Sequence, residues 1–354
     1  MLGLYIHIPF CRKKCFYCDF FSVKYDEYLA KKYVAAIIEH AKTTNAAAID
    51  TIYIGGGTPS VLSDNQIEKL LQGITDTFNL SQLKEFTFEL NPESASKEKF
   101  EILKKYGVNR VSIGLQSDDD IYLKTIGRVH NFSQFVIALN NARDAGFENI
   151  NLDLIYGLPG QTLKQWEQTL LTAVSFNCPH ISLYPLTVEE NTVFYKNNIK
   201  TEDGLQKQMY EKACEILSAN AFTHYEISNW VKPGKESLHN SNYWRNYQYL
   251  ALGAGASGYF NGQRYKNTAD IEKYINGGEI RTEVENIDEK TFETESIILG
   301  LRLLNEGVPE TQFKNKTQIL KELLDAKMLV KENEKIKLSQ DYVFTSNSVL
   351  ERFV

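Results

Sequence analysis

Three cysteines fall within eight residues near the N-terminus, in the stretch "YIHIPFCRKKCFYCDFF". Cys11, Cys15 and Cys18 have the spacing C-x3-C-x2-C, and the two remaining cysteines, Cys178 and Cys214, are isolated in the sequence. Thiolates are soft ligands that select zinc or iron–sulfur clusters. A structural zinc site usually takes four protein ligands from two paired knuckles, and no second knuckle is present. The triplet therefore predicts a metal centre with one position that no cysteine fills.

Length and charge narrow the class of protein. A chain of 354 residues is long enough for one large domain and a smaller one. A net charge of -6 and a pI near 5.7 argue against general nucleic-acid binding, which needs a basic face. The sequence has no signal-peptide pattern and no apolar run long enough to cross a bilayer. Clustered rather than evenly spaced cysteines do not suggest a secreted disulfide framework, so we expect a cytoplasmic protein.

Short β-rich runs alternate with helix-like segments over the first 222 residues. The helical segments have apolar residues spaced at three and four, a candidate Ser63 cap, and stop glycines such as Gly107. Alternation of single strands and helices predicts right-handed βαβ units and a parallel sheet. Six units fall short of the eight in a closed barrel, and a doubly wound sheet fits the count equally well. The strands are expected at 4–8, 51–55, 86–90, 111–115, 150–156 and 181–186.

Three parts of the chain differ in pattern. Residues 1–222 carry the α/β alternation, which we interpret as a partial (β/α)6 TIM-like barrel. Residues 223–286 are rich in aromatic residues, Asn and Gly, and predict a connecting region of loops and short strands. Residues 287–354 predict helices, a charged hairpin at 330–339 and a last helix, which together suggest an α+β, winged-helix-like extension.

Polar residues stand at the ends of the predicted strands. Glu89, Gln116 and Asp153 lie at or just after apolar runs, and a Gly-Gly-Gly-Thr segment, 55–58, follows the second strand. Polar groups at the C-terminal ends of barrel strands usually form the active face. Turn or cap roles are the alternative, but burial of a carboxylate inside a strand costs free energy without partners. We therefore expect one shared site.

A [4Fe–4S] cube held by three thiolates leaves one iron free for a small molecule with an amine and a carboxylate. His7 could complete a zinc site with the three cysteines, but its place in the preceding strand favours a packing or supporting role. The spacing C-x3-C-x2-C resembles that of the radical S-adenosylmethionine (SAM) superfamily. The segments "YIGGGTPS", "FELNPE", "SIGLQS", "LKTIGRVH" and "LDLIYGLPGQT" extend the likeness toward its oxygen-independent coproporphyrinogen III oxidase-like group.

This resemblance implies a radical SAM fold and a role for each matching residue. Cys11, Cys15 and Cys18 would hold the cluster, which Tyr5 would support. The backbone near Gly56, Gly57 and Thr58 would bind the methionyl amino group, and Arg128 would pair with the methionyl carboxylate. The nucleoside part of SAM would contact Tyr17, Glu89, Gln116 and Asp153.

Two branches of that group are distinguished by short features. The decarboxylating oxidases carry a further cysteine two positions after the third, where this sequence has Phe20, and a longer N-terminal segment. The HemW-type heme chaperones resemble this chain in "CFYCDF", "HYEISNW" and the H-N-x-x-Y-W motif at 239–244. By that resemblance His239 is a candidate axial ligand of heme iron, with Tyr243 and Trp244 packing on the macrocycle. A satisfied structural histidine is the alternative.

A second glycine pattern is a weaker signal. Gly253, Gly255 and Gly258 match the G-x-G-x-x-G of dinucleotide-binding folds, but no helix opens at the third glycine. We expect a turn-rich connection there.

Three functions remain in competition at this point. The preferred one is a heme chaperone that carries a [4Fe–4S] cluster, binds SAM and passes heme to an acceptor, such as a membrane-bound respiratory protein. The second is an oxygen-independent coproporphyrinogen III oxidase that forms vinyl groups through a 5′-deoxyadenosyl radical. The third is a zinc-stabilised protein. The sequence leaves the electron donor open.

Overall fold

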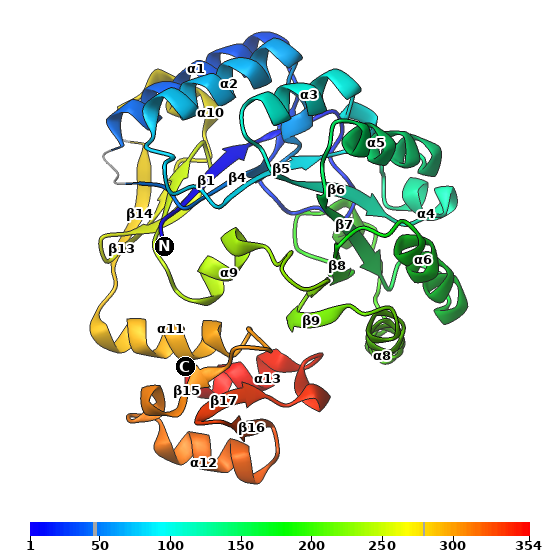
Figure 1. Ribbon diagram of the computed structural model, residues 1–354, viewed down its shortest axis with the longest axis vertical. Helices are drawn as coiled ribbons and strands as arrows, with labels where there is room; N and C mark the ends of the chain where they lie inside the picture. The colour runs from blue at the N-terminus through cyan, green and yellow to red at the C-terminus, as the bar shows by residue number, and fades with distance from the viewer. Residues whose placement is uncertain (45–47, 279) are drawn as a thin grey trace.

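The computed structural model describes residues 1–44, 48–278 and 280–354. Its main feature is a 12-stranded sheet with the order β14-β13-β12-β11-β1-β4-β5-β6-β7-β8-β10-β9 (Figure 1). Its six middle strands, from β1 to β8, run parallel to one another. They are β1 (Gly3–Ile8), β4 (Thr51–Gly56), β5 (Glu85–Leu90), β6 (Arg110–Gln116), β7 (Asn149–Tyr156) and β8 (His180–Pro185).

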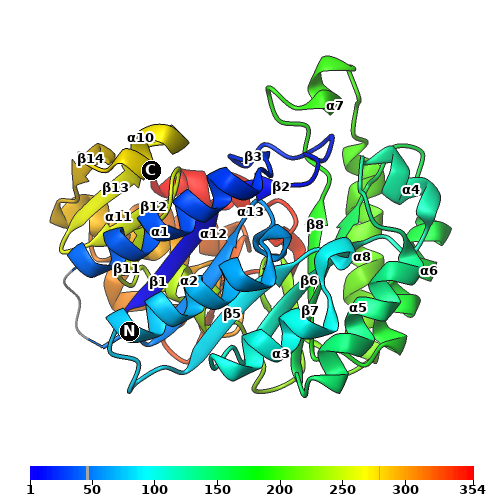
Figure 2. The same cartoon turned by 90° about the horizontal axis from the view of Figure 1, so that it is seen from above.

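Helices connect these strands and cover the outer face of the sheet (Figure 2). The predicted caps are present: the Ser63 hydroxyl accepts from the backbone N–H of Gln66 in a capping box, and Gly107 follows α3 with φ of 84°. The large helices are α1 (Glu27–Thr43), α2 (Asp64–Thr77), α3 (Lys97–Lys105), α5 (Phe132–Asp144), α6 (Leu163–Ser175) and α8 (Asp203–Ala219). The prediction of a partial (β/α)6 barrel is confirmed, and the doubly wound alternative is wrong because the six strands follow one another in sequence order across the sheet.

Several short elements follow the C-terminal ends of the parallel strands. They are the strands β2 (Phe10–Cys11) and β3 (Val23–Lys24), the helices α4 (Asp120–Thr125) and α7 (Val193–Lys196), and the 3-10 turns η1 (Pro59–Val61) and η2 (Pro92–Ser94). β2 pairs in parallel with β3, and these two strands hold the ends of the cysteine segment.

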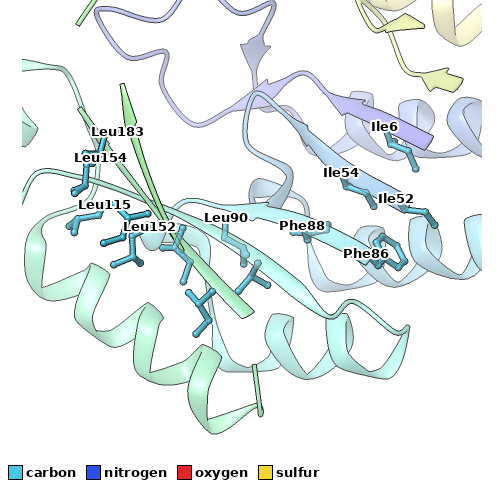
Figure 3. Packing of buried hydrophobic residues seen from close by; sticks show 14 of the residues in the cluster. Ile6, Ile52, Ile54, Phe86, Phe88, Leu90, Leu115, Leu152, Leu154 and Leu183 are labelled. Atoms are coloured by element: carbon cyan, nitrogen blue, oxygen red, sulfur yellow. The ribbon is translucent and has the colours of Figure 1, made fainter. Parts of the chain in front are cut away.

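The hydrophobic core lies between the sheet and its helices. Ile54, Phe88, Leu152 and Leu154 point from neighbouring strands toward the helices and are fully buried (Figure 3). Because side chains alternate along a strand, the residues between them point to the inner face of the sheet, away from the helices. Many of those inner residues are polar, which is the reason why the apolar runs of this sequence contain Glu, Asn and Asp.

Residues 223–286, predicted as a connecting region, lengthen the sheet at both edges. β10 and β9 continue from β8, while β11 pairs in parallel with β1 and leads to β12, β13 and β14. The predicted boundary at 222 therefore falls between strands of one sheet, and the three-part division stays a prediction. The elements are β9 (Thr223–Glu226), β10 (Asn229–Val231), α9 (Leu238–Trp244), β11 (Tyr249–Leu252), β12 (Ser257–Phe260), β13 (Gln263–Asn267), α10 (Ile271–Asn276) and β14 (Arg281–Asn286).

The last part of the chain forms a small α+β unit below the barrel (Figure 1). A three-stranded sheet, β15-β17-β16, contains the predicted charged hairpin and packs with short helices. The helices and strands are α11 (Glu289–Gly300), β15 (Val308–Pro309), η3 (Glu310–Phe313), α12 (Thr317–Asp325), β16 (Leu329–Glu332), β17 (Lys335–Leu338), η4 (Gln340–Tyr342), α13 (Ser346–Leu350) and η5 (Glu351–Phe353). Within the described ranges, no helix combines the length and the apolar character needed to span a bilayer.

The core makes a direct prediction about stability. Leu152 on β7 is fully buried, whereas Leu171 on α6 is 46% exposed. Leu152→Ala is expected to lower the free energy of unfolding by about 2–5 kcal/mol, because buried methyl groups are lost from the core and a cavity remains. Leu171→Ala, the matched control, should change it by less than about 0.5 kcal/mol. Urea denaturation of both variants measures the difference, and equal effects would contradict the described core.

Candidate functional site

The three clustered cysteines lie close together in the chain: Cys11 ends β2, and Cys15 and Cys18 lie on the loop from β2 to β3, the cysteine loop. All three are half-buried free thiols, and all three line a cavity of about 500 Å³ at the C-terminal ends of the parallel strands. Two backbone hydrogen bonds fix the loop: the N–H of Phe16 donates to Ile126 O at 3.0 Å, and the N–H of Phe194 donates to Phe16 O at 3.0 Å. The loop is therefore anchored to the residue that follows α4 and to α7.

The same cavity collects nearly all of the other residues that the sequence predicted for SAM. Tyr5 is the exception: it lies beneath, where its hydroxyl and His7 Nδ1 form a hydrogen bond of 2.8 Å. His7 contacts Phe21 O through Nε2 at 3.0 Å, so that histidine supports the loop. The predicted residues that line the cavity besides the cysteines are Tyr17, Gly56, Gly57, Thr58, Glu89, Gln116, Arg128 and Asp153.

The glycine-rich segment passes directly under the cysteine loop. Gly56 has φ of 116°, and a Cβ there would stand 2.6 Å from the ring of His7. A Cβ on Gly57 would stand 2.9 Å from Phe10 O and 3.1 Å from Cys11 Sγ. The Thr58 hydroxyl donates to Cys11 Sγ at 3.5 Å. Only glycine permits this approach, which leaves backbone polar groups beside the thiols.

Arg128 connects the cysteine loop to the strand ends. Its guanidinium lies 3.7 Å from Cys15 Sγ and donates to Asn91 Oδ1 at 2.8 Å and to Gly114 O at 3.2 Å. Asn91 in turn donates to Thr58 Oγ1 at 3.0 Å. Asn91 stands directly after β5, among the polar strand-end residues for which the sequence favours a shared site, with a turn or cap role as the alternative. A half-buried guanidinium that is fixed at the cavity wall is suited to a carboxylate.

Two half-buried carboxyl groups, Glu89 and Asp153, lie on β5 and β7, the strands on either side of β6. Glu89 accepts from the Tyr53 hydroxyl at 2.6 Å and from the N–H of Gly56 at 3.1 Å. Burial raises the pKa of Glu89 to about 7, although the Tyr53 hydrogen bond opposes the shift. Asp153 accepts from Ser112 at 2.7 Å and from Asn151 at 2.9 Å, and burial raises its pKa as well. These oxygens can accept hydrogen bonds from hydroxyl groups of a bound molecule.

Gln116 reaches the cavity through an irregularity of β6. The pairing of β6 with β7 shifts register between Gly114 and Gln116, and Gln116 has φ of 66°. A non-glycine residue in the left-handed region is strained, and such positions cluster at functional sites. The bulge turns a side chain that ends a buried strand toward the cavity.

The H-N-x-x-Y-W motif lies at the other end of the barrel. His239, on α9, is 1% exposed and contacts residues that begin the strands: its Nδ1 bonds Thr51 Oγ1 at 2.9 Å, and its N–H donates to Glu85 at 3.2 Å. Its Nε2 bonds the Tyr243 hydroxyl at 2.8 Å. Burial lowers the pKa of His239 to about 3. The structure therefore separates the motif from the cysteines.

A smaller cavity of about 280 Å³ opens beside this motif. Tyr243 lines it, whereas Trp244 lies under the guanidinium of Arg302, which is 4.5 Å from the centre of its ring. The other aromatic residues around this cavity are Tyr247, Tyr249 and Tyr259. We call it the tyrosine cavity.

The second glycine pattern forms a turn, as expected. Gly253 and Gly255 follow β11, and Gly258 lies within β12, so no helix opens there. A Cβ on Gly253 would stand 2.4 Å from His7 O, which accounts for the glycine by close packing under the cysteine loop.

Comparison with known proteins decides the family. Residues 5–173 match the model of the radical SAM superfamily. Heme chaperone HemW of Lactococcus lactis is 38% identical, with 99% of this chain and 96% of the relative covered. Heme chaperone HemW of Bacillus subtilis is 40% identical, with 100% and 99% covered. The chain belongs to the HemW family of the radical SAM superfamily. The predicted resemblance is confirmed.

A solved structure agrees with the fold of this HemW family member. The coproporphyrinogen III oxidase HemN from Escherichia coli superposes with a TM-score of 0.86 at 20% identity, covering 99% of this chain and 89% of its own. At that identity the likeness concerns the fold alone. It extends to the C-terminal unit, in agreement with the predicted fold class.

The superfamily of the HemW family implies a [4Fe–4S] cluster and SAM. The donor set fits the cluster: the three cysteines are free thiols, and the Arg128 guanidinium lies 3.7 Å from the Sγ atom of Cys15. Within residues 1–44, 48–278 and 280–354, no three His, Cys, Asp or Glu side chains converge on a single metal ion. A cube does not require convergence, because each thiolate binds its own iron.

The raised pKa of Glu89 predicts how the free energy of unfolding depends on pH. Its pKa of about 7 lies above the ordinary 4.5, so the folded state binds the proton more tightly than the unfolded state. The free energy of unfolding should therefore fall as the pH rises from about 4.5 to about 7. Glu89→Gln, which stays neutral, should remove about 1–3 kcal/mol of that fall. Urea denaturation at several pH values, without SAM, measures it.

The control for this prediction is Glu101→Gln, a change of the same kind on the exposed side of α3. It should leave the pH dependence as it is in the wild-type protein. Glu226 also has a pKa raised to about 7 by burial, so part of the fall should remain in Glu89→Gln. An unchanged pH profile in Glu89→Gln would show that Glu89 ionises normally.

Proposed function

We propose that this protein is a heme chaperone that carries a [4Fe–4S] cluster, binds SAM and passes heme to an acceptor protein. The observation that carries the proposal is identity of 38–40% over nearly the whole chain to two proteins named heme chaperone HemW. Within the chain, it is supported by the cavity at the strand ends, where three thiols, a half-buried guanidinium and two half-buried carboxyl groups come together.

In this proposal Cys11, Cys15 and Cys18 each bind one iron, and the fourth iron takes the amino and carboxylate groups of SAM. Arg128, held by Asn91 and Gly114 O, would pair with that carboxylate. The exposed polar backbone near Gly56, Gly57 and Thr58 would receive the amino group. Tyr5 would support the site indirectly: its hydroxyl bonds His7, and His7 bonds Phe21 O and so holds the cysteine loop.

The nucleoside of SAM would lie across the ends of β5, β6 and β7. Glu89 and Asp153 would accept hydrogen bonds from the ribose hydroxyls, and Gln116 would contact the same part from the bulge of β6. Tyr17, on the cysteine loop, would pack against the adenine. When bound, the cluster and SAM together supply one-electron cleavage chemistry.

For heme, we propose that the macrocycle binds at the barrel base near the tyrosine cavity. Tyr243 opens into that cavity, and His239 Nε2 lies 2.8 Å behind the Tyr243 hydroxyl. Ligation of iron by His239 requires this hydrogen bond to break and α9 to shift, since both ring nitrogens are engaged. The low pKa of His239 keeps the imidazole neutral, the form that binds iron. Trp244 would pack on the macrocycle once Arg302 moves from its ring.

Coproporphyrinogen III oxidation is the alternative function, because the chain contains the residues that the resemblance assigns to the cluster and to SAM. The position of the oxidases' additional cysteine is taken by Phe20, whose side chain is 66% exposed and cannot ligate metal. We propose heme itself as cargo, a heme-accepting protein such as a membrane-bound respiratory component as partner, and the cytoplasm as the place of action.

Loss of one cluster ligand gives the first functional test. Cys11→Ala is expected to bind far less iron and sulfide after anaerobic reconstitution, where the wild-type protein should take up about four of each, the content of one cube. Cys214→Ala, outside the triplet, is the matched control and should retain the cluster. An EPR signal that changes when SAM is added would support the open iron. Full iron content in Cys11→Ala would contradict the assignment.

Hemin titration tests the chaperone proposal. The wild-type protein should show a saturable change of the heme absorption spectrum, and His239→Ala should weaken binding at least about tenfold, or about 1.4 kcal/mol, because an axial ligand is lost. His40→Ala, a change of the same kind on α1, should bind hemin as the wild type does. His239 also packs at the barrel base, so His239→Ala could weaken hemin binding by unfolding that region. If the variant instead binds hemin with a spectrum that shows a changed axial ligand, the loss is one of ligation and not of folding.

Two outcomes would contradict the chaperone proposal. One is the absence of saturable hemin binding by the folded wild-type protein. The other is accumulation of protoporphyrinogen when the reconstituted protein is incubated anaerobically with coproporphyrinogen III, SAM and a reductant. The second outcome would favour the oxidase.

A further inference from the structure

A chain of hydrogen bonds runs through the interior of the barrel from the cavity to α9. Asp153 Oδ1 accepts from Asn151 Nδ2 at 2.9 Å, and Asn151 Oδ1 lies 2.6 Å from His180 Nδ1. His180 Nε2 lies 2.9 Å from the Tyr225 hydroxyl, which accepts from the backbone N–H of Ser237 at 3.3 Å. Ser237 is the N-cap of α9. We call this set of residues, Asp153, Asn151, His180, Tyr225 and Ser237, the barrel relay.

Every hydrogen bond of the barrel relay has its donor on the side of α9. The Asn151 amide nitrogen donates to Asp153, so the amide oxygen faces His180, and His180 Nδ1 carries the proton between them. Burial holds the pKa of His180 well below its ordinary value, so the ring is neutral and Nε2 accepts from the Tyr225 hydroxyl. Hydrogen bonds that run in one direction through a buried interior polarise one another. Each bond therefore depends on the charge of Asp153.

The two ends of the barrel relay lie at the two proposed binding sites. Asp153 lines the cavity, where it would accept a hydroxyl group of the SAM ribose. Ser237 begins α9, which lies between the sheet and the C-terminal unit (Figure 1). α9 must shift before His239 can ligate heme iron, because both ring nitrogens of His239 are bonded. A ligand at either end therefore acts on the same set of bonds, whose inner members, Asn151, His180 and Tyr225, are at most 4% exposed.

Two anchors hold the start of α9. Glu85, at the start of β5 and away from the cavity, accepts from two backbone N–H groups in the first turn of the helix. Tyr225 is the other anchor: its hydroxyl holds Ser237, and its backbone oxygen accepts the N–H of Leu304 in the C-terminal unit at 2.9 Å. Because the second anchor is in series with Asp153, it is the one that a ligand in the cavity can weaken.

We propose that the barrel relay couples SAM binding to heme binding, with His180 and Tyr225 as its positioning residues. A ribose hydroxyl that donates to Asp153 would share the charge of that carboxylate, which weakens the bond from Asn151 and each bond behind it. Ser237 is then held less tightly, and α9 shifts at a lower cost in free energy. SAM should therefore tighten heme binding, and heme should tighten SAM binding by the same factor. The inference rests on the proposed function, since it takes SAM in the cavity and heme at the barrel base.

Hydrogen exchange of α9 tests the relay without heme. The wild-type protein with its cluster is compared with and without S-adenosylhomocysteine, which has the ribose, amino and carboxylate groups of SAM. Amide exchange of residues 237–244, followed by mass spectrometry, should be at least about fivefold faster with the ligand, the lower end of typical coupling between sites. Methionine alone, which lacks the ribose, should leave the exchange unchanged. Exchange that is equal with and without S-adenosylhomocysteine would overturn the inference, and so would equal acceleration by methionine.

Hemin titration measures the coupling itself. The wild-type protein with its cluster should bind hemin at least about fivefold more tightly when S-adenosylhomocysteine is saturating. Tyr225→Phe keeps the buried ring and removes the hydroxyl that joins His180 to Ser237. This variant should bind hemin with the same affinity in the presence and absence of the ligand. The ratio of the two affinities is the readout, because a purely structural defect changes both affinities and leaves their ratio.

A second buried tyrosine supplies the matched control. Tyr210, on α8, is 8% exposed and lies outside the barrel relay. Tyr210→Phe removes a hydroxyl from the interior in the same way and should keep the wild-type ratio of hemin affinities. Urea denaturation of both variants, without ligands, shows that the compared proteins are folded.

The outcomes separate this inference from the proposed function. Saturable hemin binding with a ratio of one in the wild-type protein overturns the coupling and leaves the chaperone proposal in place. A ratio that Tyr225→Phe leaves unchanged overturns the relay. Loss of the ratio in Tyr210→Phe overturns it as well, because the coupling would then follow the packing of the interior in general. Failure of the folded wild-type protein to bind hemin overturns both proposals.

Discussion

Alternate residues of the parallel strands point to the inner face of the sheet, and on β5 these are Glu85, Thr87 and Glu89. An inner carboxylate is stable only when it is hydrogen-bonded, because burial otherwise costs several kcal/mol. Glu89 obtains its partners from Tyr53 and the N–H of Gly56, whereas Glu85 obtains them from the first N–H groups of α9. Because these carboxylates need hydrogen-bond donors, the glycine segment lies beside Glu89 at one end of the barrel, and α9 lies beside Glu85 at the other end.

Much of this arrangement could be predicted from the sequence. Strand and helix periodicity gave the six βαβ units within one or two residues, since each unit is local and strongly amphipathic. The spacing of the cysteines and the polar strand ends located the cavity, because parallel strands bring their C-terminal ends together. Arg128 was assigned by resemblance, and its contacts with Cys15 and Asn91 agree with a place in the same cavity.

Other features depend on contacts between distant residues, which no local pattern records. The short strands of 223–286 join the sheet at both edges because β11 finds β1, almost 250 residues earlier. A satisfied structural histidine was the alternative for His239, but the motif did not identify Thr51 and Glu85 as its hydrogen-bond partners. Asn91 was among the polar strand ends, but the hydrogen bond that it accepts from Arg128, 37 positions further on, could not be predicted.

The position of α9 has a mechanical consequence. Its N-terminus is fixed to β5 through Glu85, and its C-terminus is fixed to the last unit, where Arg302 covers Trp244 and Arg245 forms an ion pair with Glu306. A seven-residue helix held at both ends has little freedom to move alone. Any molecule that draws His239 or Trp244 out of place therefore loosens the joint between barrel and C-terminal unit. Under the proposed function, heme that binds at the base of the barrel would therefore change how the C-terminal unit sits, and an acceptor protein could recognise that change.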